Sequence, residues 1–455
     1  MTTDATDLAQ PGIPAAARRG PAYPAGIADD ANMWSRISRL CLLVAVFFSG
    51  WTLLRVGSIN LTFSDLAFLA CLAIVAMQGR LNAVPFGPLT PFWIAGLAIM
   101  LGGLFVSSII NGDPLRWANV AIQYTVAYLF IPLLLMQQEQ RLTRILPMMF
   151  VLGTTLSEAI GIASTFVFTF NDTVDLLGDG FITGNHRLGA MAGQPNPNGA
   201  VIAFSLPMLI YAVSKETMPR LVGLLCGIIL LWGLMLSASF TGFFASVLAI
   251  TLTLALMGLQ HVVRLGLIVA VAAGLFVASG APLPKAFQER VGSAVESGDL
   301  NQAGTFVNRS ELIAEAWNFA EDTTIVGMGV DRYRELSHHD NPVHNLYLLI
   351  WNEGGSVAFI GLVVLLALLC AMAAAGLRRS REGGAMACAV VVVFLIYTAS
   401  YPHMYSRMWV MPIMVALSVI YVRRDESAGL PRPVAGADEP LRDFPQSSPG
   451  RYSRS

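Results

Sequence analysis

Charged residues are scarce in this sequence. Asp, Glu, Lys and Arg make up 13% of its 455 residues, while 55% of the residues are hydrophobic; an ordinary soluble domain carries roughly 25% charged residues. So little charge cannot cover a water-facing surface over this length, which excludes a soluble globular protein. Most of the chain must be solvated by lipid, and we predict an all-α polytopic membrane protein. The formal net charge of −1 gives no support for a nucleic-acid partner.

Cysteine is also rare, and its placement argues against two kinds of site. All five cysteines fall in apolar runs without a paired spacing, which favours small core residues over disulfides or metal ligands. They are Cys41, Cys71, Cys226, Cys370 and Cys388.

Apolar runs long enough to cross a bilayer recur about twelve times along the chain. The predicted spans are residues 39–56, 61–78, 91–110, 115–136, 144–169, 198–214, 218–237, 240–258, 262–280, 353–376, 385–402 and 406–422. Residues 1–35 and 425–455 lack this patterning and are rich in Pro with Ala, Gly, Ser or Arg, which is typical of disordered tails. The sequence is thus divided into tails, spans 1–9 within residues 36–280, a long loop at 281–344, and spans 10–12 within residues 345–424.

Lys and Arg are distributed unevenly between the connections. If the N-terminus is cytoplasmic, about fifteen of these residues lie inside, and the short outside loops hold only Arg55, Arg116, Arg187 and Arg407. The positive-inside rule therefore places both termini in the cytoplasm. Two outside connections, residues 170–197 and residues 281–344, are candidates for function because loops of such length are uncommon in compact domains.

The larger outside loop contains TFVNRSELIAEAWNFAED, which has a helical pattern. A helical projection places Arg309 in the middle of an apolar face with Ile313 and Trp317, and places Glu311 and Glu315 on the opposite face. An Arg packed against the membrane domain needs an anionic partner, either a carboxylate or a ligand phosphate. A structural ion pair or a side chain reaching the lipid headgroups would explain Arg309 equally well.

The smaller outside loop contains GNHRLGAMAGQPNPNGA. Its two Asn-Pro units predict a turn before the sixth span, where Asn196 and Asn198 would cap the helix and its N–H groups would form an anion site. Arg187 is the cation of this loop. The alternative is a capped helix start with a charge that only sets the topology.

Histidines gather at the end of the larger loop, in SHHDNPVHN. We do not predict a metal site from His338, His339, Asp340 and His344, because adjacent histidines in a loop rarely converge on one ion. His344 differs because it adjoins an apolar run, and a neutral imidazole there can accept a proton from a hydroxyl. The acids within the spans, Asp65 and Glu158, are isolated in the sequence, whereas a proton-coupled transporter usually carries a series of them.

Taken in order, these segments resemble the O-antigen ligase and polymerase superfamily of bacterial inner-membrane proteins. The matching stretches are HRLGAMAGQPNPNGA, NRSELIAEAW, TTIVGMGVDRY and, most specifically, HNLYLLIWNEGG. The resemblance implies a metal-independent membrane glycosyltransferase of the C-type architecture, without a cofactor, whose active site faces the periplasm. Its donor would be a glycan on undecaprenyl diphosphate, and its acceptor a sugar or a lipid-linked glycan.

The resemblance also implies roles for individual residues. Arg187 and Arg309 would hold the diphosphate, and His344 would activate the acceptor hydroxyl. Asn196, Asn198, Asn345 and Glu353 belong to the matching motifs and are expected to contact the substrate.

The sequence departs from the family pattern at one position. Many relatives carry Ser-Arg before the eighth span, whereas this sequence has Phe240 at the expected Arg. This departure favours a polymerase of exopolysaccharide or O-antigen repeat units over a ligase without separating the two. A transporter or flippase for lipid-linked sugars and a scaffold for a secretion complex are the alternatives from other functional classes.

Overall fold

The computed structural model describes residues 25–55, 61–136, 138–258, 260, 283–297, 306–322, 324–338, 342–402 and 404–422. Of these residues, the side chains of 25–32, 294, 306–309 and 322 are not described. Within this part of the chain the regular structure is helical, with two isolated β-bridges, and the prediction of an all-α membrane protein is confirmed.

The helices follow one another along the chain with short connections. Their bounds are α1 (Ala25–Phe47), α2 (Phe63–Met77), η2 (Gly87–Leu89), α3 (Thr90–Asn111), α4 (Pro114–Thr125), η3 (Val126–Phe130), α5 (Ile131–Leu135), α6 (Gln140–Val167), α7 (Phe170–Leu177), η4 (Ala190–Ala192), α8 (Pro195–Ser214), α9 (Arg220–Ser237), α10 (Phe240–Met257), α12 (Lys285–Phe287), η5 (Gln288–Gly292), α13 (Ser293–Ser297), α14 (Phe306–Asp322), α15 (Arg332–Leu336), α16 (Leu346–Arg379), α17 (Arg381–Thr398) and α18 (Arg407–Ser418).

Eight helical stretches among the described residues are long and apolar enough to cross a membrane. They comprise α3 with η2, the continuous run of α4, η3 and α5, and the helices α6, α8, α9, α10, α16 and α17. Helices α2 and α18 are apolar but shorter. The predicted span 262–280 lies outside the described residues, so the count of twelve stays a prediction. Helix α1 begins within the predicted tail and ends at Phe47, before the predicted end of the first span, because the chain turns at Ser49 and Gly50.

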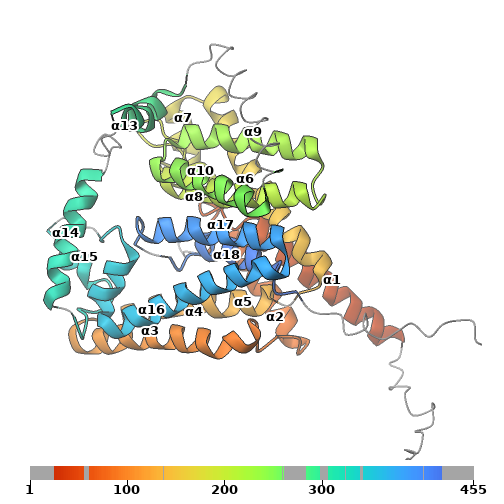
Figure 1. Cartoon of the computed structure of the whole chain (residues 1–455), viewed down its shortest axis with the longest axis horizontal. Coiled ribbons are helices and arrows are strands. Elements are labelled where there is room, and N and C mark those ends of the chain that lie inside the picture. Colours follow the sequence, from red (N-terminus) through yellow and green to blue (C-terminus); the bar gives the residue numbers. More distant parts are fainter. Residues whose placement is uncertain are drawn as a thin grey trace, which may run out of the picture. The chain divides into compact units, whose positions relative to one another are not determined.

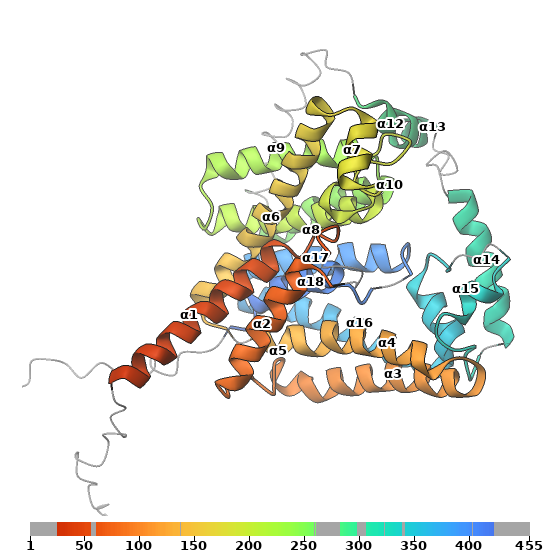
Figure 2. The ribbon, with the colours of Figure 1, turned by 180° about the vertical axis from the view of Figure 1, so that it is seen from behind.

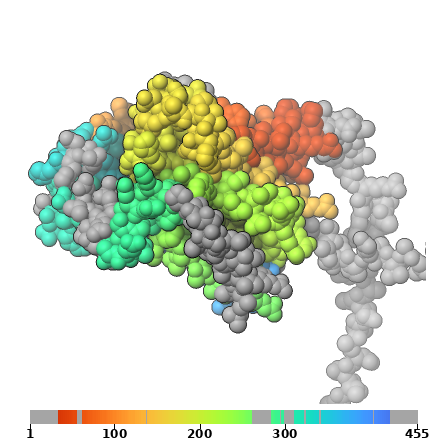
Figure 3. Space-filling view, turned by 90° about the horizontal axis from the view of Figure 1, so that it is seen from above, coloured from red at the N-terminus to blue at the C-terminus, as the bar shows by residue number. Residues whose placement is uncertain are grey.

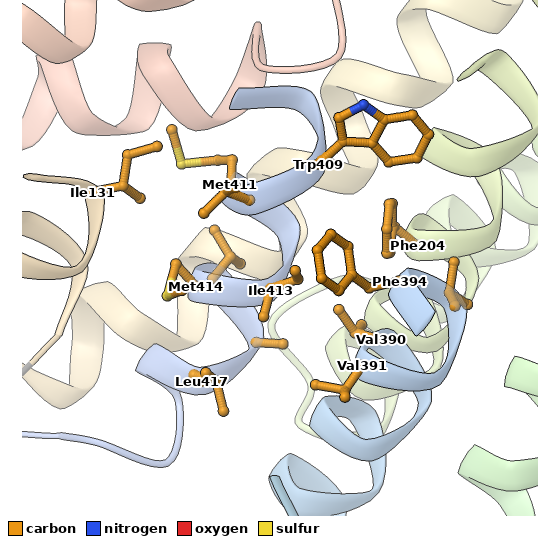
Figure 4. Close-up of a cluster of buried hydrophobic side chains, with 14 of the residues drawn as sticks. Ile131, Phe204, Val390, Val391, Phe394, Trp409, Met411, Ile413, Met414 and Leu417 are labelled. Carbon is orange, nitrogen blue, oxygen red and sulfur yellow. The ribbon is translucent and has the colours of Figure 1, made fainter. Parts of the chain in front are cut away.

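Helices α8, α17 and α18 form the centre of the packing. Every residue from Met408 to Ser418 in α18 is buried. Figure 4 shows α18 side chains between Ile131 of α5 and Phe394 of α17, with Phe204 of α8 near the Trp409 ring. Helices α3 and α9 instead expose large apolar side chains such as Phe92 and Leu221. Such exposure suits helices that face lipid.

Helix α16 is broken at Gly355, where φ is 69° and ψ is −173°. Residues 324–331 lie along this break and supply backbone hydrogen bonds that a regular helix would make internally. The N–H of Met328 donates to Asn352 O (2.8 Å), and the N–H of Gly329 donates to Glu353 O (2.9 Å). The same segment is bonded to the end of α3, which packs along α16 (Figure 1, Figure 2). The segment therefore joins the long loop to the membrane helices.

The predicted apolar face of α14 is wrong in part. Leu312 and Ala316 are buried and Phe319 packs beside them, whereas Ile313 and Trp317 are exposed. The face against the protein is therefore shifted toward the side that carries Glu315. The reason is tertiary, because Glu315 binds the segment that follows α15.

Candidate functional site

Several helix ends meet at one place in the structure. The starts of α8, α10 and α16 lie close to the ends of α9 and α17, and hydrogen bonds join them. The Tyr397 hydroxyl of α17 donates to the backbone oxygen of Asn196 in α8 (3.3 Å). The hydroxyls of Tyr347 in α16 and Thr398 in α17 are 2.9 Å apart. These bonds fix the start of α16 relative to the start of α8.

The loop between α7 and α8 closes one side of this region. A turn between Ile182 and Leu188 is held by an isolated β-bridge, and the N–H of Leu188 donates to Leu236 O in α9 (3.0 Å). Gly180 packs directly on the backbone of Gly193, so that a Cβ on Gly180 would overlap the Gly193 carbonyl oxygen. The two arms of the loop therefore touch through backbone atoms, which holds the intervening side chains in a fixed relation.

Arg187 is buried in this loop, with 8% of its surface exposed. Its Nε donates to the carbonyl oxygen of Ser237 at the end of α9 (2.9 Å), and its Nη2 donates to Asn196 Oδ1 (2.9 Å). A helix C-terminus carries partial negative charge and stabilises a cation placed there. The guanidinium thus lies between the end of α9 and the start of α8.

Asn196 and Asn198 do not cap α8, and this prediction is wrong. The helix begins at Pro195, and its N-cap residue is Gln194, whose side chain makes no capping bond. Pro195 and Pro197 have no N–H, and the N–H of Asn198 donates to Gln194 O (2.9 Å). The start of α8 therefore offers fewer N–H groups to an anion than the sequence predicts.

The two asparagines differ in their environment. Asn196 Oδ1 accepts hydrogen bonds from Arg187 and from the Ser239 hydroxyl (3.2 Å), which caps α10. Asn198 is buried, and its Nδ2 donates to Glu158 Oε2 in α6 (3.2 Å) and to Leu188 O (3.3 Å). Asn196 therefore joins the arginine to the start of α10, whereas Asn198 binds a buried carboxylate.

The acids of the spans have side-chain partners that the sequence did not indicate. Glu158 is fully buried in α6 and accepts the bond from Asn198. Asp65 at the start of α2 forms an ion pair with Arg407 at the start of α18. Neither acid is isolated in the fold, because helices distant in the sequence supply the partner.

His344 and Asn345 lie immediately before α16. Asn345 is the N-cap of this helix, and its side chain accepts a hydrogen bond from the N–H of Leu348 (3.1 Å). This bond explains an asparagine after the histidine without any ligand. His344 is half-buried, and it lines a cavity together with Asn196.

This cavity has a volume of about 400 Å³. Its polar lining comes from Asp179, Thr183, Gln194, Asn196, His344 and Tyr401. The structure thus brings together His344 from the larger loop and Asn196 from the smaller loop, as the sequence predicts. The volume lies within the range of small-molecule sites.

Three lining residues were not identified from the sequence. Asp179 and Gln194 are exposed, and Tyr401 is half-buried with its ring 5.0 Å from the Trp409 ring. Asp179 lies between two glycines in the sequence GDG, which is only a weak signal of a site. Tyr401 follows α17, far along the chain, and nothing in its local pattern marks it.

Glu353 lies elsewhere. It lines a second, smaller cavity with Tyr124 and Tyr405, and its Oε1 accepts a hydrogen bond from the N–H of Asp331 (3.0 Å). The conserved appearance of an acid in the motif is thus matched by a bond that holds residues 324–331 against the break in α16.

Arg309 lies in α14, but its side chain is outside the described part of the structure. Of the histidine cluster, His339 and Asp340 are also outside it. Among the described residues no group of three His, Cys, Asp or Glu could hold a metal ion. His338 is bonded instead to Glu315 of α14, with 2.8 Å between its Nδ1 and Glu315 Oε1.

Glu315 is the acceptor in a small polar cluster. Burial raises the pKa of this carboxyl group, but hydrogen bonds from the backbone and ring of His338 and from the hydroxyls of Ser337 and Tyr333 outweigh it and lower the pKa to about 2. The carboxylate thereby ties α14 to the end of α15 at neutral pH.

Comparison with known proteins places this geometry in a family. Residues 225–363 match the family model described as O-antigen ligase. Arg309, His344 and Glu353 lie within the matched residues, whereas Arg187 and Asn196 precede them. No curated protein matches the chain. On the match and the helical membrane fold, the chain is identified as a member of the O-antigen ligase and polymerase superfamily.

Proposed function

We propose that this protein transfers a glycan from undecaprenyl diphosphate to an acceptor sugar hydroxyl at the periplasmic face of the bacterial inner membrane. The family supports a role in glycan transfer for surface polysaccharide synthesis. The observation that carries the proposal is the position of His344, which lines a cavity with Asn196, the residue that binds Arg187.

The reaction needs a base and a place for negative charge. The acceptor oxygen forms a bond to the anomeric carbon of the donor while the bond from that carbon to the diphosphate breaks. The hydroxyl proton passes to the His344 imidazole, and the bonding electron pair leaves with the carrier diphosphate. Cations that lie near this charge lower the barrier.

The two arginines supply that charge without a metal ion in our proposal. Arg187 lies behind the Asn196 side chain, and the start of α10 at Ser239 adds the partial positive charge of a helix N-terminus. Arg309 would approach from α14. Phe240, the first residue of α10, stands where many relatives carry Arg, so this donor site has one cation fewer. This difference favours a polymerase of repeat units over a ligase.

The test is turnover by the purified protein in lipid nanodiscs with a glycan on undecaprenyl diphosphate. We expect extended or transferred glycan together with released carrier diphosphate. His344→Ala should reduce turnover about 10²–10⁴-fold, and Arg309→Ala about 10²–10³-fold. His338→Ala in the same loop and Arg334→Ala in α15 serve as matched controls and should retain activity.

Survival of turnover in both His344→Ala and Arg309→Ala would reject the site. A transporter of the same lipid-linked sugars is the second candidate, because Glu158 is a buried carboxylate within a span. That function predicts translocation of a labelled lipid-linked sugar across proteoliposomes, loss of translocation in Glu158→Gln, and no chemical product.

A further inference from the structure

We propose that the cavity beside His344 is a subsite for the acceptor sugar, and that the Asp179 carboxylate selects an acceptor sugar without negative charge. The inference rests on the proposed glycan transfer and adds a substrate class to it. It does not concern the diphosphate, which the structure separates from this cavity.

The lining of the cavity suits sugar hydroxyls. Asp179 offers two acceptor oxygens, while the Gln194 amide can both donate and accept. Neither side chain makes a hydrogen bond or ion pair with the described part of the chain, so both are available to a ligand. Tyr401 adds an aromatic ring whose position is set by its contact with Trp409. Hydroxyl acceptors, an amide and a ring are a combination that binds one sugar ring by its edge and its face.

The charge of the lining opposes a diphosphate. The cavity is lined by a carboxylate, whereas Arg187 does not line it and has Asn196 between itself and the cavity. Like charges a few ångströms apart repel each other by about 1 kcal/mol in water and by several times more near a protein surface. The cation and the carboxylate therefore divide the site, with the diphosphate toward Arg187 and neutral hydroxyls toward Asp179.

The backbone fixes Asp179 in this position. Gly178 at the end of α7 has φ of 89°, and Gly180 packs against the backbone of Gly193. Asp179 is held between these two points, opposite the turn that carries Gln194 and Asn196. A carboxylate on a loop braced in this way keeps one orientation toward the cavity, which selection between neutral and acidic sugars requires. Figure 3 shows the chain around residue 170 (yellow) at the surface, from which this loop continues.

Two probes test the inference directly. They are short oligosaccharides that differ only in the terminal sugar, a neutral hexose in one and the corresponding uronic acid in the other. Binding to the protein in nanodiscs is measured by saturation-transfer NMR, and transfer is measured with the same termini on a polyprenyl-diphosphate carrier. We expect the wild-type protein to favour the neutral sugar about tenfold.

Variants of Asp179 make the expectation specific. Asp179→Asn should bring the ratio of neutral to acidic binding close to one, and Asp179→Lys should favour the acidic probe. Asp175→Asn, an exposed acid one turn earlier on α7 and outside the cavity lining, should leave the ratio unchanged. An equal ratio in the wild-type protein and Asp179→Asn, or no binding of either probe, overturns the inference.

Failure of this inference differs from failure of the proposed function. Transfer with an acceptor preference that ignores Asp179 would leave glycan transfer intact and remove the subsite. Binding that depends on Asp179 without chemical turnover of any donor would keep the sugar site and remove the transferase.

Discussion

Replacement of Gly355 by alanine tests whether the break in α16 holds the long loop against the membrane helices. The φ of 69° with ψ of −173° at this residue is a conformation that only glycine adopts without strain. A Cβ would also overlap the carbonyl oxygen of Ile325, which cannot move without the backbone. Residues 324–331 must therefore withdraw from α16 in Gly355→Ala.

The cost follows from the lost conformation and the lost bonds. Strain at this conformation costs about 1–3 kcal/mol. Three backbone hydrogen bonds between residues 324–331 and α16 (2.8–3.0 Å) contribute about 1 kcal/mol each. We therefore expect Gly355→Ala to destabilise the protein by about 4–6 kcal/mol if the segment cannot adapt.

The assay is thermal unfolding in detergent, combined with hydrogen exchange of residues 324–331 and glycan transfer. Gly102→Ala in α3 is the matched control, because a Cβ there meets no atom within 4 Å and the position is helical. It should leave the melting temperature unchanged or raise it slightly. If Gly355→Ala unfolds and exchanges like Gly102→Ala, the structural account of the glycine pair in the motif is wrong.

Three further predictions concern buried polar groups. Glu315→Gln should loosen α14, seen as faster hydrogen exchange at neutral pH; because its pKa falls from 4.5 to about 2 on folding, the stabilisation of about 3 kcal/mol is present above pH 4.5, fades as the pH falls toward 2, and should be absent from the pH profile of the variant. Arg407→Met should cost about 3–5 kcal/mol by leaving the Asp65 carboxylate buried without its cation, and Asp65→Asn in the same chain should recover most of the loss in thermal unfolding; no recovery would contradict the pairing. Asn198→Ala should cost about 1–3 kcal/mol by removing the donor to a buried carboxylate, and an unchanged melting temperature would show that this bond contributes nothing.

The HNLYLLIWNEGG motif shows how function and structure share one pattern. His344 at its start lines the cavity, but Asn345 caps α16, and Glu353 holds the backbone of residues 324–331. The glycine that follows allows the break in the helix. A motif read only as a catalytic signature therefore overstates the number of residues that contact substrate, because most of this one builds the start and the break of a helix.

Hydropathy and charge by themselves determined the membrane class, most spans and the two long connections, because lipid solvation acts on local composition over about 20 residues. They also placed His344 at the start of a span. Only the tertiary structure decided that Asn196 binds Arg187 rather than capping α8, since Pro195 begins that helix. It also brought Asp179 and Tyr401 to the cavity. Contacts between helix ends far apart in the sequence depend on packing, and no local pattern records them.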